Sequence, residues 1–360
     1  MDKYIKFLII AFSFIYVGNV FAQMGTETFR INGYSSFEFE KQLGDEGKGD
    51  PNGSFDADLF DLVFNIFATD RLRIAADLTW EHGAATEDGR GNVAVEYAFG
   101  EYLLKDWLKV RAGKMFTPFG IYNEIHTAKP AFLTVKEPLS TNKNNKFGSD
   151  MRFYPRWATG MAALGNFQVS NINADYILLV SNGDQEMTNP FEEDNNKQKS
   201  IAGRLRFNPL NNLNLGVSLY TDKLTELDTL GEDTGDRTSQ ISYGGQAEYT
   251  FMHAGLELEY VAGSLDMTEP DEKLSSYAYT AMVYYIINDF LTPYIRYEFL
   301  DPNSDLDDDE ANQFIYGLNF KISEHLFLKG EINSVSSKML NQRFNGVDYS
   351  EFKAAIAIGF

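Results

Sequence analysis

Apolar and polar residues alternate with a period of two along much of the chain, and the pattern is clearest at its C-terminal end. From residue 352 onward the even positions are apolar through to the final residue, Phe360, whereas Glu351 and Lys353 occupy odd positions. A period of two places alternate side chains on opposite faces of a β-strand. The pattern therefore predicts a strand with one apolar face and one polar face.

The same alternation marks sixteen segments, each about the ~9–11 residues that a tilted membrane strand needs or slightly longer. We expect strands at residues 27–42, 55–68, 71–81, 92–104, 107–116, 157–164, 167–181, 199–208, 212–222, 240–251, 254–263, 275–287, 290–300, 312–322, 326–336 and 349–360.

The connections between these segments alternate between short and long. Tight turns are expected at Thr69-Asp70, Lys105-Asp106, Gly165-Asn166, Pro209-Asn211, Met252-His253, Asn288-Asp289 and Ser323-His325. Short periplasmic turns that alternate with longer outside loops are typical of an outer-membrane barrel. A soluble β-sandwich, the alternative, has no reason to alternate in this way. The predicted fold is therefore an all-β, transmembrane antiparallel β-barrel of about sixteen strands.

In the clearest segments the charged residues share one parity, which assigns the two faces. Arg73 and Asp77 oppose Ile74 in segment 71–81, and Arg204 opposes Leu205 in segment 199–208. A Lys or Arg on the lipid face would cost about 2–4 kcal/mol near the midplane. The charged faces must therefore line a polar lumen, which at sixteen strands is wide enough to hold water.

Two segments do not show a clean alternation. Segment 275–287 is apolar and aromatic on both parities, and segment 157–164 consists largely of small residues. Either segment could face a neighbouring subunit instead of lipid, or lie beneath a loop that folds into the barrel. The sequence leaves both explanations open.

The N-terminal residues 1–22 are expected to be a secretory signal peptide, which would leave residues 23–360 as the barrel. Lys3 and Lys6 precede an apolar core, and the segment ends at Ala22. An N-terminal membrane anchor is the alternative, but the apolar core is short for a ~20-residue span. The absence of cysteine is compatible with an oxidising periplasm.

Composition narrows the class of protein further. The net charge of −21 argues against nucleic-acid binding, which needs a basic face. The 29 Phe and 20 Tyr are numerous enough to form aromatic girdles at the two membrane interfaces. No cofactor or paired metal-ligand motif is indicated.

The third outside connection, residues 117–156, is far longer than the others, and long connections are often functional. We expect it to fold into the barrel and constrict the pore; the alternative is an insertion that lies over the top. Three acidic residues oppose its basic ones, which are Lys129, Lys136, Lys143, Lys146, Arg152 and Arg156.

Further basic residues are expected on the lumen wall, mostly in the periplasmic halves of their strands: Arg30, Arg71, Arg73, Lys109, Arg111, Arg204, Arg206, Lys321 and Lys329. A ring of Arg and Lys favours anions, and the planar guanidinium can grip two phosphate oxygens. Alternatively, these charges pair across strands with carboxylates such as Asp61 and Asp77. The acidic outer loops, of which 301–310 is the extreme case, either are solvated tips or bind divalent cations near lipopolysaccharide phosphates.

The stretch from Val110 to Glu124 contains Gly113, Lys114, Pro118, Phe119 and Gly120. It resembles the phosphate-selective porin O/P-like family, whose members often carry Gly-Lys-Phe-x-x-Pro-Phe-Gly where a strand enters the long loop. The resemblance implies a homotrimeric channel for small anions or other polar solutes. From the residues alone, Pro118 and Gly120 end the strand, and Phe116 and Phe119 could belong to an aromatic girdle.

The terminal Phe360 resembles the signal that outer-membrane barrels present to the barrel-assembly machinery. An adhesin or receptor that uses the acidic outer loops is the alternative function. An enzyme would need a catalytic set held together. The sequence has no Gly-x-Ser-x-Gly elbow, and two of its four histidines, His253 and His325, fall in expected periplasmic turns. A gated transporter would need a plug domain, for which no segment is expected before the first strand.

Overall fold

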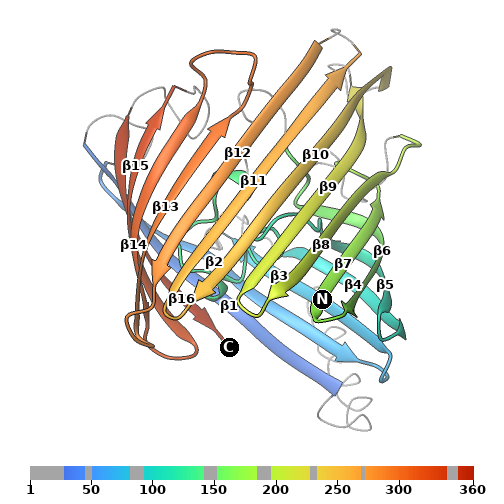
Figure 1. Cartoon of the computed structure of the whole chain (residues 1–360), viewed down its shortest axis with the longest axis horizontal. Coiled ribbons are helices and arrows are strands. Elements are labelled where there is room, and N and C mark those ends of the chain that lie inside the picture. The colour runs from blue at the N-terminus through green and yellow to red at the C-terminus, as the bar shows by residue number, and fades with distance from the viewer. Residues whose placement is uncertain are drawn as a thin grey trace, which may run out of the picture.

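The protein forms one closed barrel of antiparallel strands in the computed structural model (Figure 1). The structure describes residues 28–44, 51–81, 93–141, 152–184, 196–227, 233–268, 272–338 and 348–360. The expected signal peptide, Lys143 and Lys146 lie outside these described residues. The strands are β1 (Phe29–Leu43), β2 (Ser54–Phe67), β3 (Leu72–Glu81), β4 (Ala94–Lys105), β5 (Leu108–Phe116), β6 (Trp157–Val169), β7 (Ile172–Ser181), β8 (Ser200–Leu210), β9 (Leu213–Leu227), β10 (Asp233–Phe251), β11 (Ala254–Met267), β12 (Glu272–Tyr285), β13 (Leu291–Asp301), β14 (Ala311–Lys321), β15 (Leu326–Ser337) and β16 (Tyr349–Gly359).

Each strand pairs with its sequence neighbours, and β16 pairs with β1 to close the ring. The backbone N–H of Gly33 donates to the carbonyl of Phe360 at 2.9 Å, and the Phe360 N–H donates back at 3.0 Å. A Cβ at Gly33 would lie 2.3 Å from Cζ of Phe360. The glycine therefore leaves room for the terminal aromatic ring where the barrel closes.

All sixteen predicted segments are strands, which confirms the fold class, but two predicted turns are displaced. Gly165 and Asn166 lie inside β6, where they pair with Tyr176 and Asp175 of β7. The chain reverses instead at Ser170, which has a positive φ of 55°. Pro209 likewise lies within β8. Both errors have one cause: residues that favour turns also tolerate the end of an extended strand when the outward apolar alternation continues beyond them.

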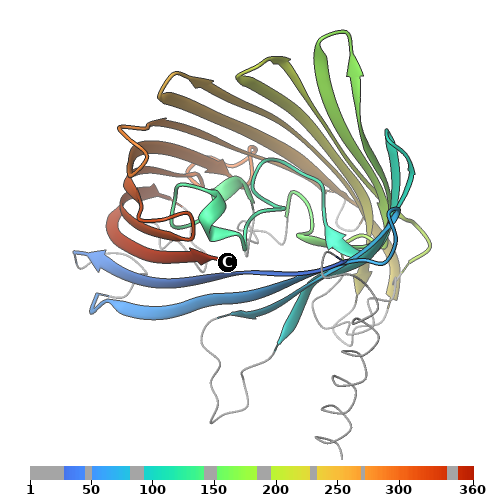
Figure 2. The same ribbon diagram turned by 90° about the horizontal axis from the view of Figure 1, so that it is seen from below.

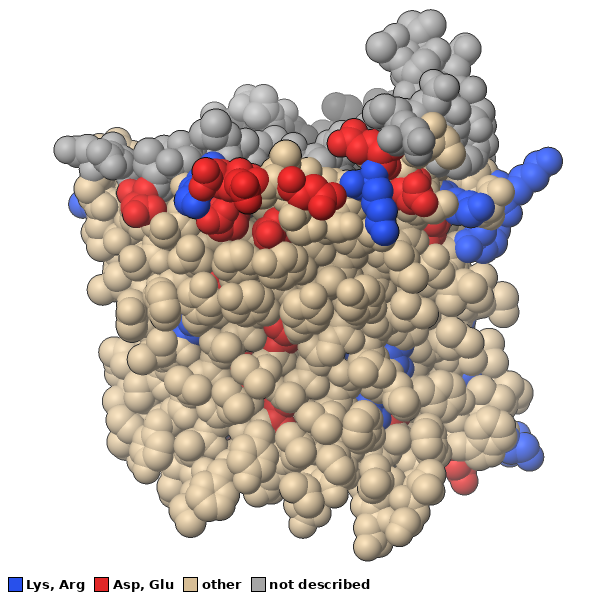
Figure 3. Space-filling view, turned by 45° about the horizontal axis from the view of Figure 1, so that its top comes forward, with Lys and Arg blue, Asp and Glu red and all other residues tan. Residues whose placement is uncertain are grey.

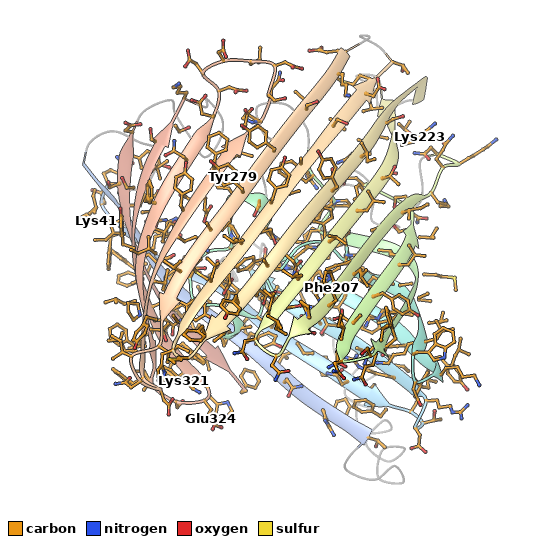
Figure 4. All side chains as sticks on the ribbon, in the orientation of Figure 1. Lys41, Phe207, Lys223, Tyr279, Lys321 and Glu324 are labelled. Carbon is orange, nitrogen blue, oxygen red and sulfur yellow. The ribbon has the colours of Figure 1, made fainter. Side chains whose placement is uncertain are left out.

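The outer surface of the barrel carries a broad apolar belt. In Figure 3 the acidic and basic side chains gather along one rim, and a wide band with few charges lies below them. Ile74, Val217 and Ile356 are among the large apolar side chains that point outward. In Figure 4, Lys321 and Glu324 mark one end of the strands, with Tyr279 nearer the other end. No helix in the described part of the chain is long and apolar enough to cross a membrane.

The described parts of connection 117–156 lie inside the ring of strands (Figure 2). They include two short 3₁₀ helices, η2 (Lys129–Ala131) and η3 (Leu139–Thr141). The helix η3 contacts β11, β12 and β13, whereas η2 contacts β1 and β16. The connection therefore touches opposite walls of the lumen.

The inserted connection accounts for both irregular strands. On the lumen face of β12, Leu274 and Ala278 are buried in a cluster that also contains Leu139 of η3. Ala158 of β6 belongs to the same cluster, together with Phe119. These two strands carry small or apolar residues on the lumen face because they lie beneath the loop.

Candidate functional site

Two glycines lie near the point where the chain enters the lumen, Gly113 within β5 and Gly120 in the connection that follows it. Gly113 has φ = +131°, and a Cβ there would lie 2.3 Å from the carbonyl oxygen of Ala98. Gly120 has φ = +61°, and a Cβ there would lie 2.5 Å from Oε2 of Glu259 on β11. Other residues rarely adopt these φ values and would clash here. The two glycines therefore allow the close backbone approaches that take the chain from β5 to the opposite wall.

The aromatic residues of this segment pack inside the barrel, which corrects the girdle expectation. Phe119 is 1% exposed and stacks on Tyr154 with ring centroids 4.2 Å apart. Phe116 meets His126 edge to face at 4.9 Å. Pro118, between them, is also buried. The glycine at 120 turns the chain inward, and that inward path carries both rings away from the membrane interface.

Three buried carboxylates of the lumen wall accept hydrogen bonds from the loop. Glu259 accepts from the Ile121 N–H at 2.6 Å and from the Ser140 hydroxyl at 2.9 Å. Glu298 accepts from the N–H of Leu139 at 2.8 Å, and Glu331 accepts from the N–H of Val135 at 3.0 Å. Charge-assisted bonds of this kind are about twice as strong as neutral ones.

Basic residues of the same wall bind the loop carbonyls. The Lys329 ammonium donates to the carbonyls of Lys129 at 2.6 Å, Phe132 at 2.7 Å and Thr134 at 3.0 Å. Arg296 donates to the hydroxyl of Thr134 at 2.7 Å and to the carbonyl of Lys136 at 3.0 Å. The tethers come from wall residues far away in the sequence, so the alternating pattern marks them as lumen residues without identifying their partners.

The loop lysines are surrounded by carboxylates. Lys129 is 1% exposed, and its ammonium lies 3.3 Å from Asp58, 3.6 Å from Glu38 and 3.8 Å from Glu137. Burial lowers the pKa of Lys129, but the nearby carboxylates outweigh burial and leave the pKa above its ordinary value. Lys136 pairs with Glu38 and with Asp58 at 3.3 Å.

These contacts bear directly on the expected anion site. Lys129 is buried among carboxylates, so it is not accessible to an ion in the lumen. Arg156 pairs with Glu137 at 3.3 Å, and Arg152 pairs with Asp184 at 3.7 Å. The described basic residues of the loop are therefore brought against acidic partners. Lys129 and Lys136 hold the loop to the wall, whereas Arg156 pairs within the loop and Arg152 pairs with the connection after β7.

A second basic group lies on the wall near the short-turn end of the barrel. Arg73, Lys109 and Arg111 converge on a single carboxylate, Glu101. The nitrogen–oxygen distance is 2.7 Å for Arg111 and 3.9 Å for each of the other two. Arg111 also lies 4.1 Å from the ring centroid of Phe99. Three cations share one anion, so this group keeps a net positive charge.

Two cavities open beside this group. One, of about 440 Å³, is lined by Arg30, Arg71, Arg73 and Lys109 together with Asp70 and Glu101. The other, of about 430 Å³, is lined by Lys109, Arg111, Arg204 and Arg206 together with Glu124 and Asp175. Basic side chains outnumber acidic ones in both linings, and Lys109 belongs to both.

The arginines of β8 are partly neutralised. Arg206 pairs with Asp175 at 3.0 Å, and Arg204 pairs with Glu124 of the loop. Arg204 also donates to the carbonyl of Gly120 at 3.0 Å. Lys114, from the sequence motif, lies 5.6 Å from the ring centroid of Trp157 and lines neither cavity. The candidate residues thus separate into a paired loop group and a wall group with excess positive charge.

Comparisons with known proteins agree with the observed fold. The model of the outer membrane protein beta-barrel domain matches residues 202–360. A protein from Aquifex aeolicus described as uncharacterized is 26% identical over 238 residues, which is 62% of this chain. The chain matches about half the length of that relative, 50%.

Two solved structures illustrate the similarity. An anion-selective porin from Comamonas acidovorans has a TM-score of 0.64 at 13% identity, with 92% of this chain and 99% of the porin covered. OmpT, an outer membrane protein of Vibrio cholerae in its trimer form, has a TM-score of 0.61 at 13% identity and the same coverage. The chain is therefore a porin-like, multi-pass β-barrel of the bacterial outer membrane.

Proposed function

We propose that the protein is a passive channel for small polar solutes or ions, with a preference for anions of the phosphate type. The observation that carries this proposal is the sharing of Glu101 by Arg73, Lys109 and Arg111 beside two cavities. The loop contacts many strands of the wall, among them β2, β8, β11, β13 and β15, whereas Arg73 and Lys109 line an open cavity.

The exposure of this wall lets it act on solutes. The side chains of Arg73 and Lys109 are 33% and 36% exposed, so a passing anion can exchange some of its water for a guanidinium or an ammonium. The acidic rim lies far from these cations, and screening over about 8 Å at physiological salt limits its influence on them. The inserted loop 117–156 would set the pore width, and the basic residues of the wall would supply the positive charge at the constriction.

We further propose that the barrel assembles as a homotrimer in contact with lipid and lipopolysaccharide. The trimer form of OmpT from Vibrio cholerae supports this assembly by analogy of fold alone. Recognition of Phe360 by the barrel-assembly machinery would precede closure of the β1–β16 seam. Cross-linking of the folded protein in detergent should trap a species of three chains; a single-chain species at all concentrations would contradict the trimer.

The channel proposal is tested by inserting the purified full chain into planar bilayers. We expect current to rise in discrete steps and the reversal potential in a KCl gradient to take the sign of chloride permeation. A folded barrel that gives no steps would overturn the channel, whereas steps with a cation-selective reversal potential would overturn only the anion preference.

A further inference from the structure

Two aspartates on the lumen faces of β2 and β3 are buried close together. Asp61 is 0% exposed and Asp77 is 1% exposed. In the register of the two strands, Asp61 pairs with Thr79 and Val63 pairs with Asp77. The two aspartates are therefore diagonal neighbours on one face, at a spacing of roughly 7–8 Å or less.

Three of the four carboxylate oxygens of this pair form no well-aligned hydrogen bond. Both oxygens of Asp61, Oδ1 of Asp77 and Oγ1 of Thr79 are buried without a partner in good geometry. The hydroxyls of Thr79 and Thr127 lie beside the Asp61 carboxylate. Within the part of the chain that the structure describes, neither aspartate forms an ion pair with Lys or Arg. The other buried carboxylates of this lumen behave differently: Glu259 and Glu331, for example, accept hydrogen bonds from the loop.

The surroundings of the pair offer only oxygen. Tyr34 pairs with Asp61 across β1 and β2, and Tyr97 pairs with Asp77 across β3 and β4. Glu96 is also near, but its Oε2 already accepts from the indole N–H of Trp157 at 2.8 Å. An isolated carboxylate buried without compensation is very costly. Either a bound cation or a shared proton must therefore balance this pair.

We propose that Asp61 and Asp77 bind a hard divalent cation of the Ca²⁺ class, with the Thr79 hydroxyl as a third ligand. Ca²⁺ takes carboxylate, hydroxyl and water oxygens as ligands at 2.3–2.6 Å. No three Asp, Glu, His or Cys side chains converge on one point among the described residues. The site therefore uses two carboxylates, with hydroxyl and water oxygens completing the shell.

The bound cation would neutralise two negative charges at mid-barrel, on the wall that faces the loop. Thr127 of the loop lies beside Asp61. The cation would therefore add a link between loop and wall close in sequence to Lys129, whose carbonyl the Lys329 ammonium binds. This inference does not rest on the proposed channel activity, because binding is measured without conductance.

The experiment uses the full chain in detergent, stripped with EDTA and titrated with Tb³⁺, whose luminescence is excited through nearby tyrosines. We expect one saturable equivalent that Ca²⁺ displaces. The double variant Asp61→Asn with Asp77→Asn should lose that equivalent. The matched control, Asp305→Asn with Asp307→Asn in the outer acidic loop, should keep it. Equal stoichiometry in the two double variants would overturn the site.

A second double variant tests the site if the protein with Asp61→Asn and Asp77→Asn does not fold. Tyr34→Phe with Tyr97→Phe leaves both carboxylates in place, so it should lower the sensitised emission while Ca²⁺ still displaces Tb³⁺. Unchanged emission would place the ion elsewhere and overturn the proposal. An infrared band of a protonated carboxyl that persists after Ca²⁺ is added would also overturn the proposal, because the pair would then share a proton and not bind a cation.

Discussion

Two groups of basic side chains point into the same lumen and have opposite charge balances. On the loop, Lys129 has three carboxylates within 4 Å and is buried. On the wall, Arg73, Lys109 and Arg111 share the single carboxylate of Glu101, and two of them are about one-third exposed. The loop group is neutralised and structural, whereas the wall group keeps charge that a solute can meet.

The difference teaches that the count of basic residues in a segment does not determine the field in a pore. Loop 117–156 has a positive net charge in the sequence. Its described lysines and arginines nevertheless pair with acidic residues of the wall, of the loop itself or of another connection, so little of that charge reaches the lumen. The field depends on the local ratio of cations to carboxylates and on their exposure.

The largest expected effect comes from breaking the loop group. Lys129→Met leaves Glu38, Asp58 and Glu137 buried without one of their cations, and removing one partner from a buried ion pair costs about 3–5 kcal/mol. We expect a lower free energy of unfolding in denaturant titrations of the detergent-solubilised barrel. Lys338→Met, at the exposed rim, is the control and should change little. A shifted reversal potential with unchanged stability would contradict the comparison.

The next effect comes from the Lys329 tether. Lys329→Met removes an ammonium that donates to three loop carbonyls, and bonds to charged groups are each worth about 1.5–3 kcal/mol. We expect the loop to loosen, so single-channel conductance should rise and protease should cut the loop faster. Lys321→Met, at the exposed end of β14, is the matched control. Unchanged conductance and cleavage would show that the other tethers suffice.

A smaller effect is expected from the wall group. Arg73→Gln with Lys109→Gln leaves the Arg111–Glu101 pair and removes the excess charge. One charge about 4 Å from an ion in a water-like medium contributes about 1 kcal/mol, so each substitution should reduce anion preference about fivefold. The reversal potential in a KCl gradient measures this change, and thermal stability should hardly move. Lys41→Gln at the outer rim should leave selectivity unchanged; equal shifts in both variants would refute a local effect.

The smallest expected effect is the pH dependence of stability that arises from His126 of the loop. Burial lowers the pKa of His126, Arg156 lowers it further, and Glu96 only partly opposes them. The folded protein thus binds this proton less readily than the unfolded chain, whose histidine pKa is about 6.5. The neutral His126 therefore leaves the folded protein at its full stability above that pH, and the folded protein loses stability as the pH falls below it.

Hydrogen exchange of the loop at several pH values checks this sign. Protection should decline as pH falls below about 6.5. His126→Gln should flatten the decline, whereas His325→Gln in an exposed turn should not. Protection that increases on acidification would show that the histidine is charged in the fold.

The sequence predicted some features of the fold better than others. The strands were predictable because the two-residue period is local and because lipid demands an apolar exterior on every strand. The Gly165-Asn166 turn was misplaced because turn-forming residues also fit an extended strand. The interior place of Phe119 was missed because an aromatic at a strand end suits either a girdle or a packed lumen.

By itself, the sequence determined the all-β class, the number of strands, the two faces of each strand and the exceptional length of one loop. Only the tertiary structure decided what each lumen charge binds. The Glu331 carboxylate accepts from the backbone N–H of Val135 across 196 residues, and the Lys329 ammonium donates to the carbonyl of Lys129 across 200 residues. Periodicity is a property of neighbouring residues, so it is visible along the chain. The partner of a lumen charge depends on how the barrel closes around the loop, and no local pattern records that.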